Sequence, residues 1–194
     1  MIDIKKGSPW VFWPSSICDT FPENPGNKIL SGDQYFHLTF RLTLTDNSEE
    51  QKTLFALVPR FTGLDLYKDK MTLTVTCEDG PLYINLPLLV KYQEEVIISL
   101  EHSPKEFFRL FINNKVIHEI DLKEKIFGLS DSPHILIGAG NFPKNDFNLN
   151  YTDFSLHEFI LKDRKEVISH HKFEEFIFDK SVDLTGNLNF IHKL

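Results

Sequence analysis

The chain has 194 residues, of which 41% are hydrophobic and 25% charged, and its formal net charge at pH 7 is −7. This composition excludes a disordered or fibrous chain and fits one globular domain with a core of its own. Because no segment is rich in Lys and Arg alone, nucleic acid and anionic membrane are excluded as partners, since both require a concentrated positive surface.

Apolar runs in the sequence are all shorter than the roughly 20 residues of a spanning helix, so no membrane insertion is expected. The N-terminus lacks the apolar stretch of a secretory signal, which makes the chain either cytoplasmic or an excerpt of an exported protein. Cys18 and Cys77 leave the compartment open, because two cysteines form one disulfide or remain two buried thiols. Cys77 ends an alternating segment on its apolar side, which favours the thiol.

In chain order, residues 1–34 come first and are predicted to run along an edge of the fold as extended chain, because they contain four prolines. Tyr35 to Thr45 alternates apolar with polar side chains, which is typical of a half-buried strand. Met71 to Cys77 repeats this alternation, and Asp79-Gly80-Pro81 then predicts a turn.

Further short strands are predicted at Thr53 to Val58, Gly63 to Tyr67, Leu82 to Leu86, Val96 to Glu101, Phe107 to Ile112, Lys115 to Ile120, Ile135 to Gly138 and Phe154 to Leu161. Helix signals are few: Asp121 to Phe127 fits one turn, and Phe173, Phe176 and Ile177 fit a helix or a strand equally well. Many short strands and 18 Phe residues predict an all-β fold, with two antiparallel sheets packed as a sandwich.

Three segments occur in an order that is informative. Phe107 to Val116 reads as a strand, an Asn113-Asn114 turn and a second strand; His134 to Ala139 ends in Ile-Gly-Ala; and Phe154 to Leu161 follows a loop. This series resembles the concanavalin A-like and laminin-G-like domains over residues 35–164. The resemblance implies a jelly-roll sandwich whose relatives bind carbohydrates or proteins, while a minority hydrolyse glycans.

The sequence departs from that family in two places. Asn113-Asn114 stands where the family has Asn-Gly, and Asn takes left-handed backbone angles at greater cost than Gly. Asp183 to Asn189 resembles a stretch found near the start of such domains, but here it lies near the end. Residues 165–194 are therefore expected to supply closing strands of one domain, 1–194, although the start of a truncated second repeat remains the alternative.

Glu119, Asp121 and Glu124 are the candidate catalytic residues. Their Glu-x-Asp-x-x-Glu spacing resembles that of one group of concanavalin A-like glucanases, which implies a nucleophile and an acid/base. Retaining hydrolysis requires two carboxyl groups about 5 to 5.5 Å apart. The lead-in rich in Trp that those enzymes have is absent, so the second arm of a hairpin running into a polar turn is the favoured interpretation.

Candidate ligand-binding residues come from two segments. Trp10 and Trp13 either form a platform for sugar rings or plug the end of the core, and Tyr83 and Tyr92 have the same two interpretations. The loop from Asn141 to Asn150 supplies further hydrogen-bonding groups, Asn141, Asp146 and Asn148.

Calcium is the one cofactor that the sequence suggests. Asp146, Asn148 and Asn150 alternate as hard oxygen ligands, but full coordination needs six to eight oxygens and the loop offers one carboxylate. A solvated loop is therefore favoured, and no other cofactor is expected. The sequence as a whole favours a non-catalytic recognition module, most of all for carbohydrate, with a protein-interaction or structural module as the alternative.

Overall fold

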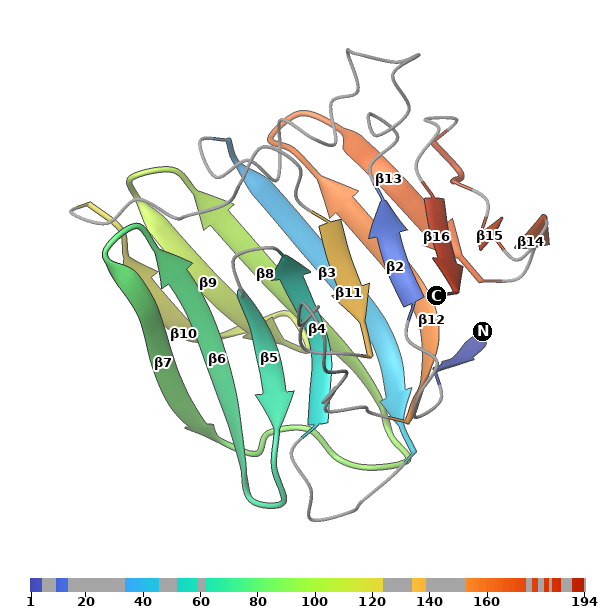
Figure 1. Ribbon diagram of the computed structural model, residues 1–194, viewed down its shortest axis with the longest axis horizontal. Coiled ribbons are helices and arrows are strands. Elements are labelled where there is room, and N and C mark those ends of the chain that lie inside the picture. The colour runs from blue at the N-terminus through green and yellow to red at the C-terminus, as the bar shows by residue number, and fades with distance from the viewer. Residues whose placement is uncertain are drawn as a thin grey trace, which may run out of the picture.

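The computed structural model describes residues 1–4, 10–13, 34–45, 52–58, 62–123, 134–138, 153–173, 176–177, 180–181, 183–185 and 190–193. These residues form two antiparallel sheets that face each other as a sandwich, as the sequence predicted (Figure 1). We call the nine-stranded sheet nearer the viewer in Figure 1 the front sheet and the seven-stranded sheet behind it the back sheet.

The back sheet is built around β12 and β3, which exchange hydrogen bonds along most of their length. Its strand order is β1 (Ile2–Ile4), β12 (Phe154–Lys162), β3 (Phe36–Leu44), β8 (Glu95–Ser103), β9 (Phe107–Ile112) and β10 (Lys115–Asp121), and β13 (Val167–Lys172) also pairs with β12. β10 is therefore one edge of this sheet.

The front sheet runs from the C-terminal segment to the hairpins in the first half of the chain. Its order is β14 (Phe176–Ile177), β15 (Lys180–Ser181), β16 (Phe190–Lys193), β2 (Trp10–Trp13), β11 (His134–Ile137), β4 (Lys52–Val58), β5 (Thr62–Leu66), β6 (Lys70–Cys77) and β7 (Gly80–Pro87). β7 is the edge strand that lies over β10 of the back sheet at one side of the sandwich (Figure 1).

Interleaved Phe and Leu side chains fill the space between the sheets. In β3 the alternation is strict, so Phe36, Phe40 and Leu44 are buried while their neighbours are half-buried. Phe40 stacks on Phe55 of the front sheet with ring centroids 4.6 Å apart, and the rings of Phe12 and Phe159 pack at a tilt with centroids 4.7 Å apart. Each such ring contributes about 1.5–3 kcal/mol by leaving water, which makes this layer the main source of stability.

Gly138, at the end of β11, shows why one glycine of the Ile-Gly-Ala segment is needed. Its φ is +80°, and a Cβ placed there would lie 2.3 Å from Cγ2 of Ile4. The Gly138 N–H donates to the carbonyl of Leu54 at 2.7 Å. Because only glycine allows this close approach, the residue lets the chain leave β11 directly beside β1.

The N-terminal and C-terminal segments differ from the sequence prediction in part. β1 lies beside β12 as expected of an edge segment, but β2 lies inside the front sheet, between β11 and β16. Phe176–Ile177 is a strand, which was one of the two interpretations of this segment, and Asp121 is the last residue of β10. Hydrogen bonds to distant partners decide these placements, and local sequence carries no signal of them.

Helices of the length and apolarity needed to span a membrane do not occur in the ranges given above.

Candidate functional site

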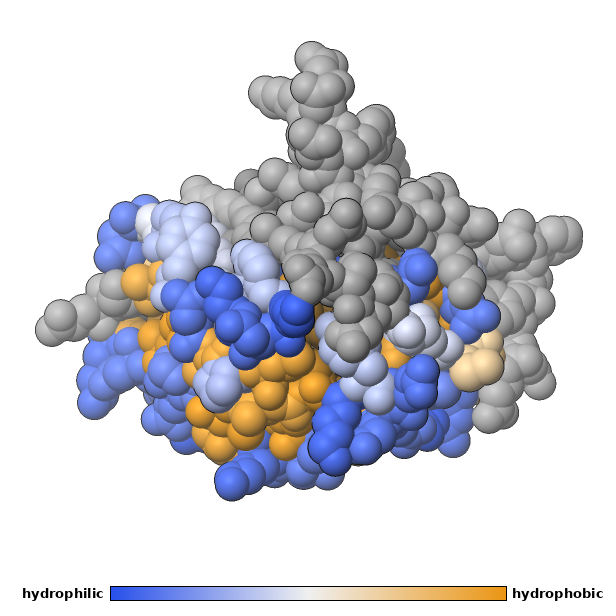
Figure 2. Space-filling model, turned by 90° about the horizontal axis from the view of Figure 1, so that it is seen from below, coloured by the Kyte–Doolittle hydropathy of each residue, from blue (hydrophilic) through white to orange (hydrophobic). Residues whose placement is uncertain are grey.

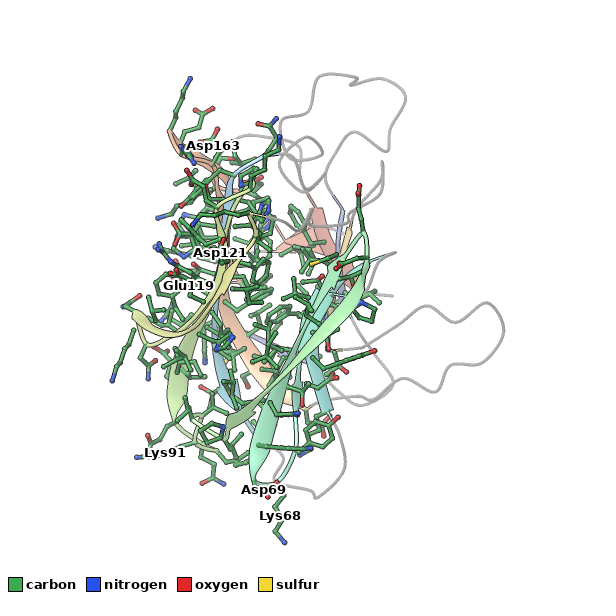
Figure 3. All side chains as sticks on the ribbon, turned by 90° about the vertical axis from the view of Figure 1, so that its left-hand side faces the viewer. Lys68, Asp69, Lys91, Glu119, Asp121 and Asp163 are labelled. Carbon is green, nitrogen blue, oxygen red and sulfur yellow. The ribbon has the colours of Figure 1, made fainter. Side chains whose placement is uncertain are left out.

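Glu119 and Asp121 lie on the outer face of β10, at the side of the molecule that faces the viewer in Figure 3. Glu119 accepts a hydrogen bond from Nε of Arg109 on the neighbouring strand, and Arg109 also contacts Glu101 at 3.5 Å. Asp121 accepts the backbone N–H of Lys123 at 3.0 Å, and this bond holds the pKa of its carboxyl group below the ordinary value.

This arrangement fits ion pairing and turn formation better than acid/base catalysis. A general acid needs a raised pKa, and the pKa of Asp121 is shifted in the opposite direction. Glu119 is half exposed and is engaged by a guanidinium. Glu124, the third residue of the pattern, lies outside the described residues. The geometry at β10 therefore favours the hairpin interpretation.

Trp10 is buried, with 8% of its surface exposed, and belongs to the hydrophobic core. A platform for sugar rings has to be open to solvent, so this burial supports the interpretation that Trp10 fills the end of the core. Tyr92 also packs against the core, with Nζ of Lys52 at 5.4 Å from its ring. The side chain of Trp13 and the residues Asn141, Asp146, Asn148 and Asn150 lie outside the described part, so their ligand and calcium roles stay predictions.

Tyr83 on β7 has the open position that Trp10 lacks. Its exposed fraction is 67%, the largest of the exposed large hydrophobic side chains in the described residues. Pro81, Tyr83, Asn85 and Pro87 form the exposed outer face of β7, while Leu82, Ile84 and Leu86 are half-buried toward the core. An exposed ring two residues from an exposed amide is the most suitable sugar-binding arrangement among the described residues.

A row of four polar side chains runs across the outer face of the front sheet and ends at Asn85. Thr53, Asp65, Thr72 and Asn85 come from β4, β5, β6 and β7 and are paired in register. We call this row the polar ladder. Thr53 donates to Oδ1 of Asp65 at 2.6 Å, and Thr72 donates to Oδ1 of Asn85 at 2.9 Å.

Burial along the polar ladder falls from its inner to its outer end. Thr53 is 1% exposed, Asp65 6% and Thr72 8%, whereas Asn85 is exposed. The buried members are fixed by hydrogen bonds, and they therefore hold the exposed amide in one orientation. Preorganised polar groups of this kind lose little entropy when a ligand binds.

Tyr67 extends the candidate site at the end of β5. Burial and the nearby Asp65 carboxylate raise the pKa of its hydroxyl group, and a hydrogen bond with Thr72 opposes this shift. Because the Thr72 hydroxyl gives its proton to Asn85, the protonated Tyr67 hydroxyl donates to Thr72 and supports the polar ladder from the side. Nζ of Lys70 lies 4.8 Å from the Tyr67 ring. Lys68 and Asp69, at the tip of the β5–β6 turn, mark the lower end of this face (Figure 3).

Gly63 lies in the row next to the polar ladder, opposite Ala56 and Thr74. A Cβ at this position would lie 2.4 Å from the carbonyl oxygen of Phe55. β4 has a register shift between Thr53 and Phe55, which brings its backbone close to β5. The glycine thus allows the irregularity that places Thr53 opposite Asp65.

An apolar area on the lower end of the sandwich is a separate surface. Figure 2 shows apolar atoms there between hydrophilic rims. The stretch after β7 carries the half-buried Leu88 and the exposed Leu89, and Lys91 marks its lower end in Figure 3. This apolar surface covers the lower end of the core, and the residues between β7 and β8 contribute no polar group to the candidate site.

In the described ranges, no group of three or more His, Cys, Asp or Glu residues could hold a metal ion.

Comparison with known proteins supports the fold. Neither a protein-family model nor a curated protein matches the sequence. Among solved structures, the chain is similar to the binding domain of botulinum neurotoxin DC in complex with rat synaptotagmin II. The TM-score is 0.56 and the identity 14%, and the match covers 82% of this chain and 38% of that chain.

Two further structures give similar values. The binding domain of botulinum neurotoxin DC in complex with SialylT matches with a TM-score of 0.54, 14% identity and the same coverage of 82% and 38%. A structure of botulinum neurotoxin type C, described with cell entry that depends on two ganglioside molecules, matches with a TM-score of 0.53, 14% identity, 82% and 38%. The chain thus spans about two-fifths of these structures, and at this identity the likeness shows the sandwich fold alone.

Proposed function

We propose that the chain is a non-catalytic recognition module that binds carbohydrate on the exposed face of β7. The observation that carries this proposal is the exposed Tyr83 ring beside Asn85. A sugar ring presents an apolar face that stacks on an aromatic side chain and hydroxyl groups at its rim that require fixed hydrogen-bonding partners. Tyr83 supplies the first and Asn85 the second.

The orientation of Asn85 follows from its bond with Thr72. Because the Thr72 hydroxyl donates to Oδ1 of Asn85 at 2.9 Å, the amide nitrogen of Asn85 points away from that contact. An amide nitrogen carries two protons, so Asn85 presents donors to a ligand that lies on the Tyr83 ring.

A more specific type of sandwich fold is also part of the proposal. We infer a concanavalin A-like jelly roll, on the order of the three sequence segments and on the two antiparallel sheets. The solved structures of similar fold include a complex with SialylT and a neurotoxin whose cell entry is described as dependent on two ganglioside molecules, which makes such a sandwich compatible with glycan recognition. A protein ligand is the alternative, because one similar domain is described with rat synaptotagmin II.

A glycan array tests the proposal, with the unchanged chain and three variants. Tyr83→Ala removes the stacking ring and should weaken binding to the recognised glycans about tenfold, equivalent to about 1.4 kcal/mol. Tyr83→Trp keeps a ring and should preserve binding. Val116→Ala is the matched control, since Val116 is an exposed apolar residue, 46% exposed, on the edge strand of the other sheet.

Two results would contradict the carbohydrate assignment. A blank array for the unchanged chain would favour the protein-interaction alternative. Binding that Tyr83→Ala and Val116→Ala leave equally unaffected would place the ligand away from β7.

A further inference from the structure

β7 and β10, which are edge strands of the front and back sheets, differ in how they are protected against pairing with a further strand. β10 carries Lys115, Glu119 and Asp121, and its register shifts between Val116 and His118. Charges and a bulge of this kind prevent a further strand from pairing. β7 has neither feature: its eight residues, Gly80–Pro87, are uncharged and pair with β6 without a register shift.

Along β7, a short window of backbone groups has no hydrogen-bonding partner among the described residues. A two-residue turn follows Cys77, so Cys77 and Gly80 form a hydrogen-bonded pair. Because hydrogen-bonded and non-hydrogen-bonded pairs alternate along an antiparallel pair of strands, Leu82, Ile84 and Leu86 use their backbone groups to bond to β6. Tyr83 and Asn85 therefore direct their N–H and C=O groups away from the sheet. Pro81 and Pro87 occupy the next outward positions and have no N–H, which limits the window at both ends.

The sequence of this window reads nearly the same in both directions. Around Ile84, Leu82 matches Leu86 and Pro81 matches Pro87, while Tyr83 exchanges with Asn85. An antiparallel strand with this symmetry is complementary to a second copy of itself, and a C2 pair is built from such a self-complementary surface. The half-buried Leu82, Ile84 and Leu86 would also gain cover from the same three side chains of the other copy.

We propose that two copies of the chain associate through β7, antiparallel and centred on Ile84, so that the two front sheets form one continuous sheet. In this register Tyr83 of each copy lies opposite Asn85 of the other, and each of these two pairs exchanges two hydrogen bonds. Ile84 faces its own equivalent in a pair without hydrogen bonds, where Cα atoms lie about 4.5 Å apart. Pro81 faces Pro87, so no N–H is left without a partner.

The pairing would also extend the candidate site. Directly opposed residues of an antiparallel pair point to the same face, so Tyr83 and Asn85 of both copies lie on one outer surface. This consequence rests on the proposed carbohydrate function, whereas the pairing itself does not.

Sedimentation of the chain over a range of concentrations, combined with three variants, tests the pairing. Asn85→Pro removes one outward N–H per copy but keeps the ladder to β6, since Pro81 and Pro87 already occupy equivalent positions. It should raise the dimer dissociation constant at least about tenfold, because each lost bond is worth roughly 1 kcal/mol. Asn85→Ala keeps the N–H and is the control, with a small effect expected.

A cross-link measures the register independently. Ile84→Cys should give a covalent dimer on oxidation, because the two sulfur atoms face each other across the axis. Leu82→Cys is the matched control and should not, since Leu82 faces Leu86. A chain that stays a monomer throughout, or a dimer that neither Asn85→Pro weakens nor Ile84→Cys cross-links, would overturn the proposal. Glycan binding by such a monomer would leave the proposed function standing.

Discussion

His102 on β8 is a titratable ring enclosed by the aromatic core. It is fully buried, its ring lies 5.1 Å from that of Phe36, and its Nδ1 contacts the carbonyl of Gln34 at 2.9 Å. A carbonyl oxygen accepts, so Nδ1 carries the proton of the neutral ring. Burial lowers the pKa of His102 to about 4, because the charged form would lose its hydration.

The lowered pKa of His102 makes stability depend on pH. Below the ordinary value of 6.5 the unfolded chain takes up a proton that the folded chain refuses until about pH 4. The free energy of unfolding should therefore fall by about 3 kcal/mol between these two pH values. Burial also lowers the pKa values of His37 and His157, which adds to the loss in the same direction.

Urea unfolding at pH 7, 5.5 and 4.5 measures this dependence. His102→Gln keeps a donor for Gln34 but does not titrate, so its free energy of unfolding should fall less steeply with acid than that of the unchanged chain. An equal slope for both chains would mean that His102 does not exclude the proton in the folded state.

At the scale of elements, the contacts of the β9–β10 hairpin explain why its turn reads Asn-Asn instead of Asn-Gly. Asn113 and Asn114 have φ values of 50° and 64°, as the two central residues of a left-handed turn require. The two positions differ in their contacts: Oδ1 of Asn113 accepts the N–H of Ile97 at 3.0 Å on β8. The backbone N–H of Asn113 also donates to the carbonyl of Ile97 at 2.8 Å. Asn113 thus joins a third strand to the hairpin through two bonds, of which glycine would keep only the backbone one.

Glycine substitutions at these two positions should therefore have opposite effects. Asn114→Gly should raise the free energy of unfolding by about 0.5 kcal/mol, since glycine adopts this backbone conformation without steric cost. Asn113→Gly gains the same relief, but the Ile97 N–H loses a partner worth about 1 kcal/mol, so the free energy of unfolding should fall by about 0.5 kcal/mol. Thermal unfolding of the two variants decides the point, and changes of the same sign and size would contradict it.

Charged side chains connect four strands of the back sheet on its outer face. Arg41 on β3 contacts Glu95 on β8 at 3.2 Å and Glu158 on β12 at 3.3 Å, and Glu158 contacts His170 on β13 at 2.8 Å. Partial burial opposes ionisation of Glu158, but the bond with His170 and the charge of Arg41 prevail and lower its pKa. These four side chains therefore bond to one another, and the network links β13, β12, β3 and β8 across the sheet.

At the scale of the whole molecule, the sequence predicted the long strands and the two-sheet class because alternation is a local signal. Phe107–Ile112 was predicted to the residue, and Tyr35 to Thr45 contains β3 with one residue to spare at each end. Closing strands were expected within residues 165–194, but the bounds of β14, β15 and β16 were not predicted, since two to four residues cannot display a period. The place of β2 depends on partners more than 100 residues away.

The candidate site was predictable only in part. The sequence identified Tyr83 as one of four aromatic candidates for stacking on a sugar, but favoured Trp10 and Trp13. The alternating pattern shows that a strand has two faces, but it does not show which aromatic ring remains exposed to solvent. Trp10 is buried because β2 lies inside the front sheet. The polar ladder had no sequence signal, because its four residues come from four separate strands.

Backbone amide chemical shifts, measured during titration with a glycan selected on the array, locate the ligand on the protein. If the outer face of β7 binds the glycan, the largest shifts should occur at Tyr83, Asn85 and the facing residues of β6. Shifts confined to β10 around Glu119, or to the Asn141–Asn150 loop, would contradict binding on β7.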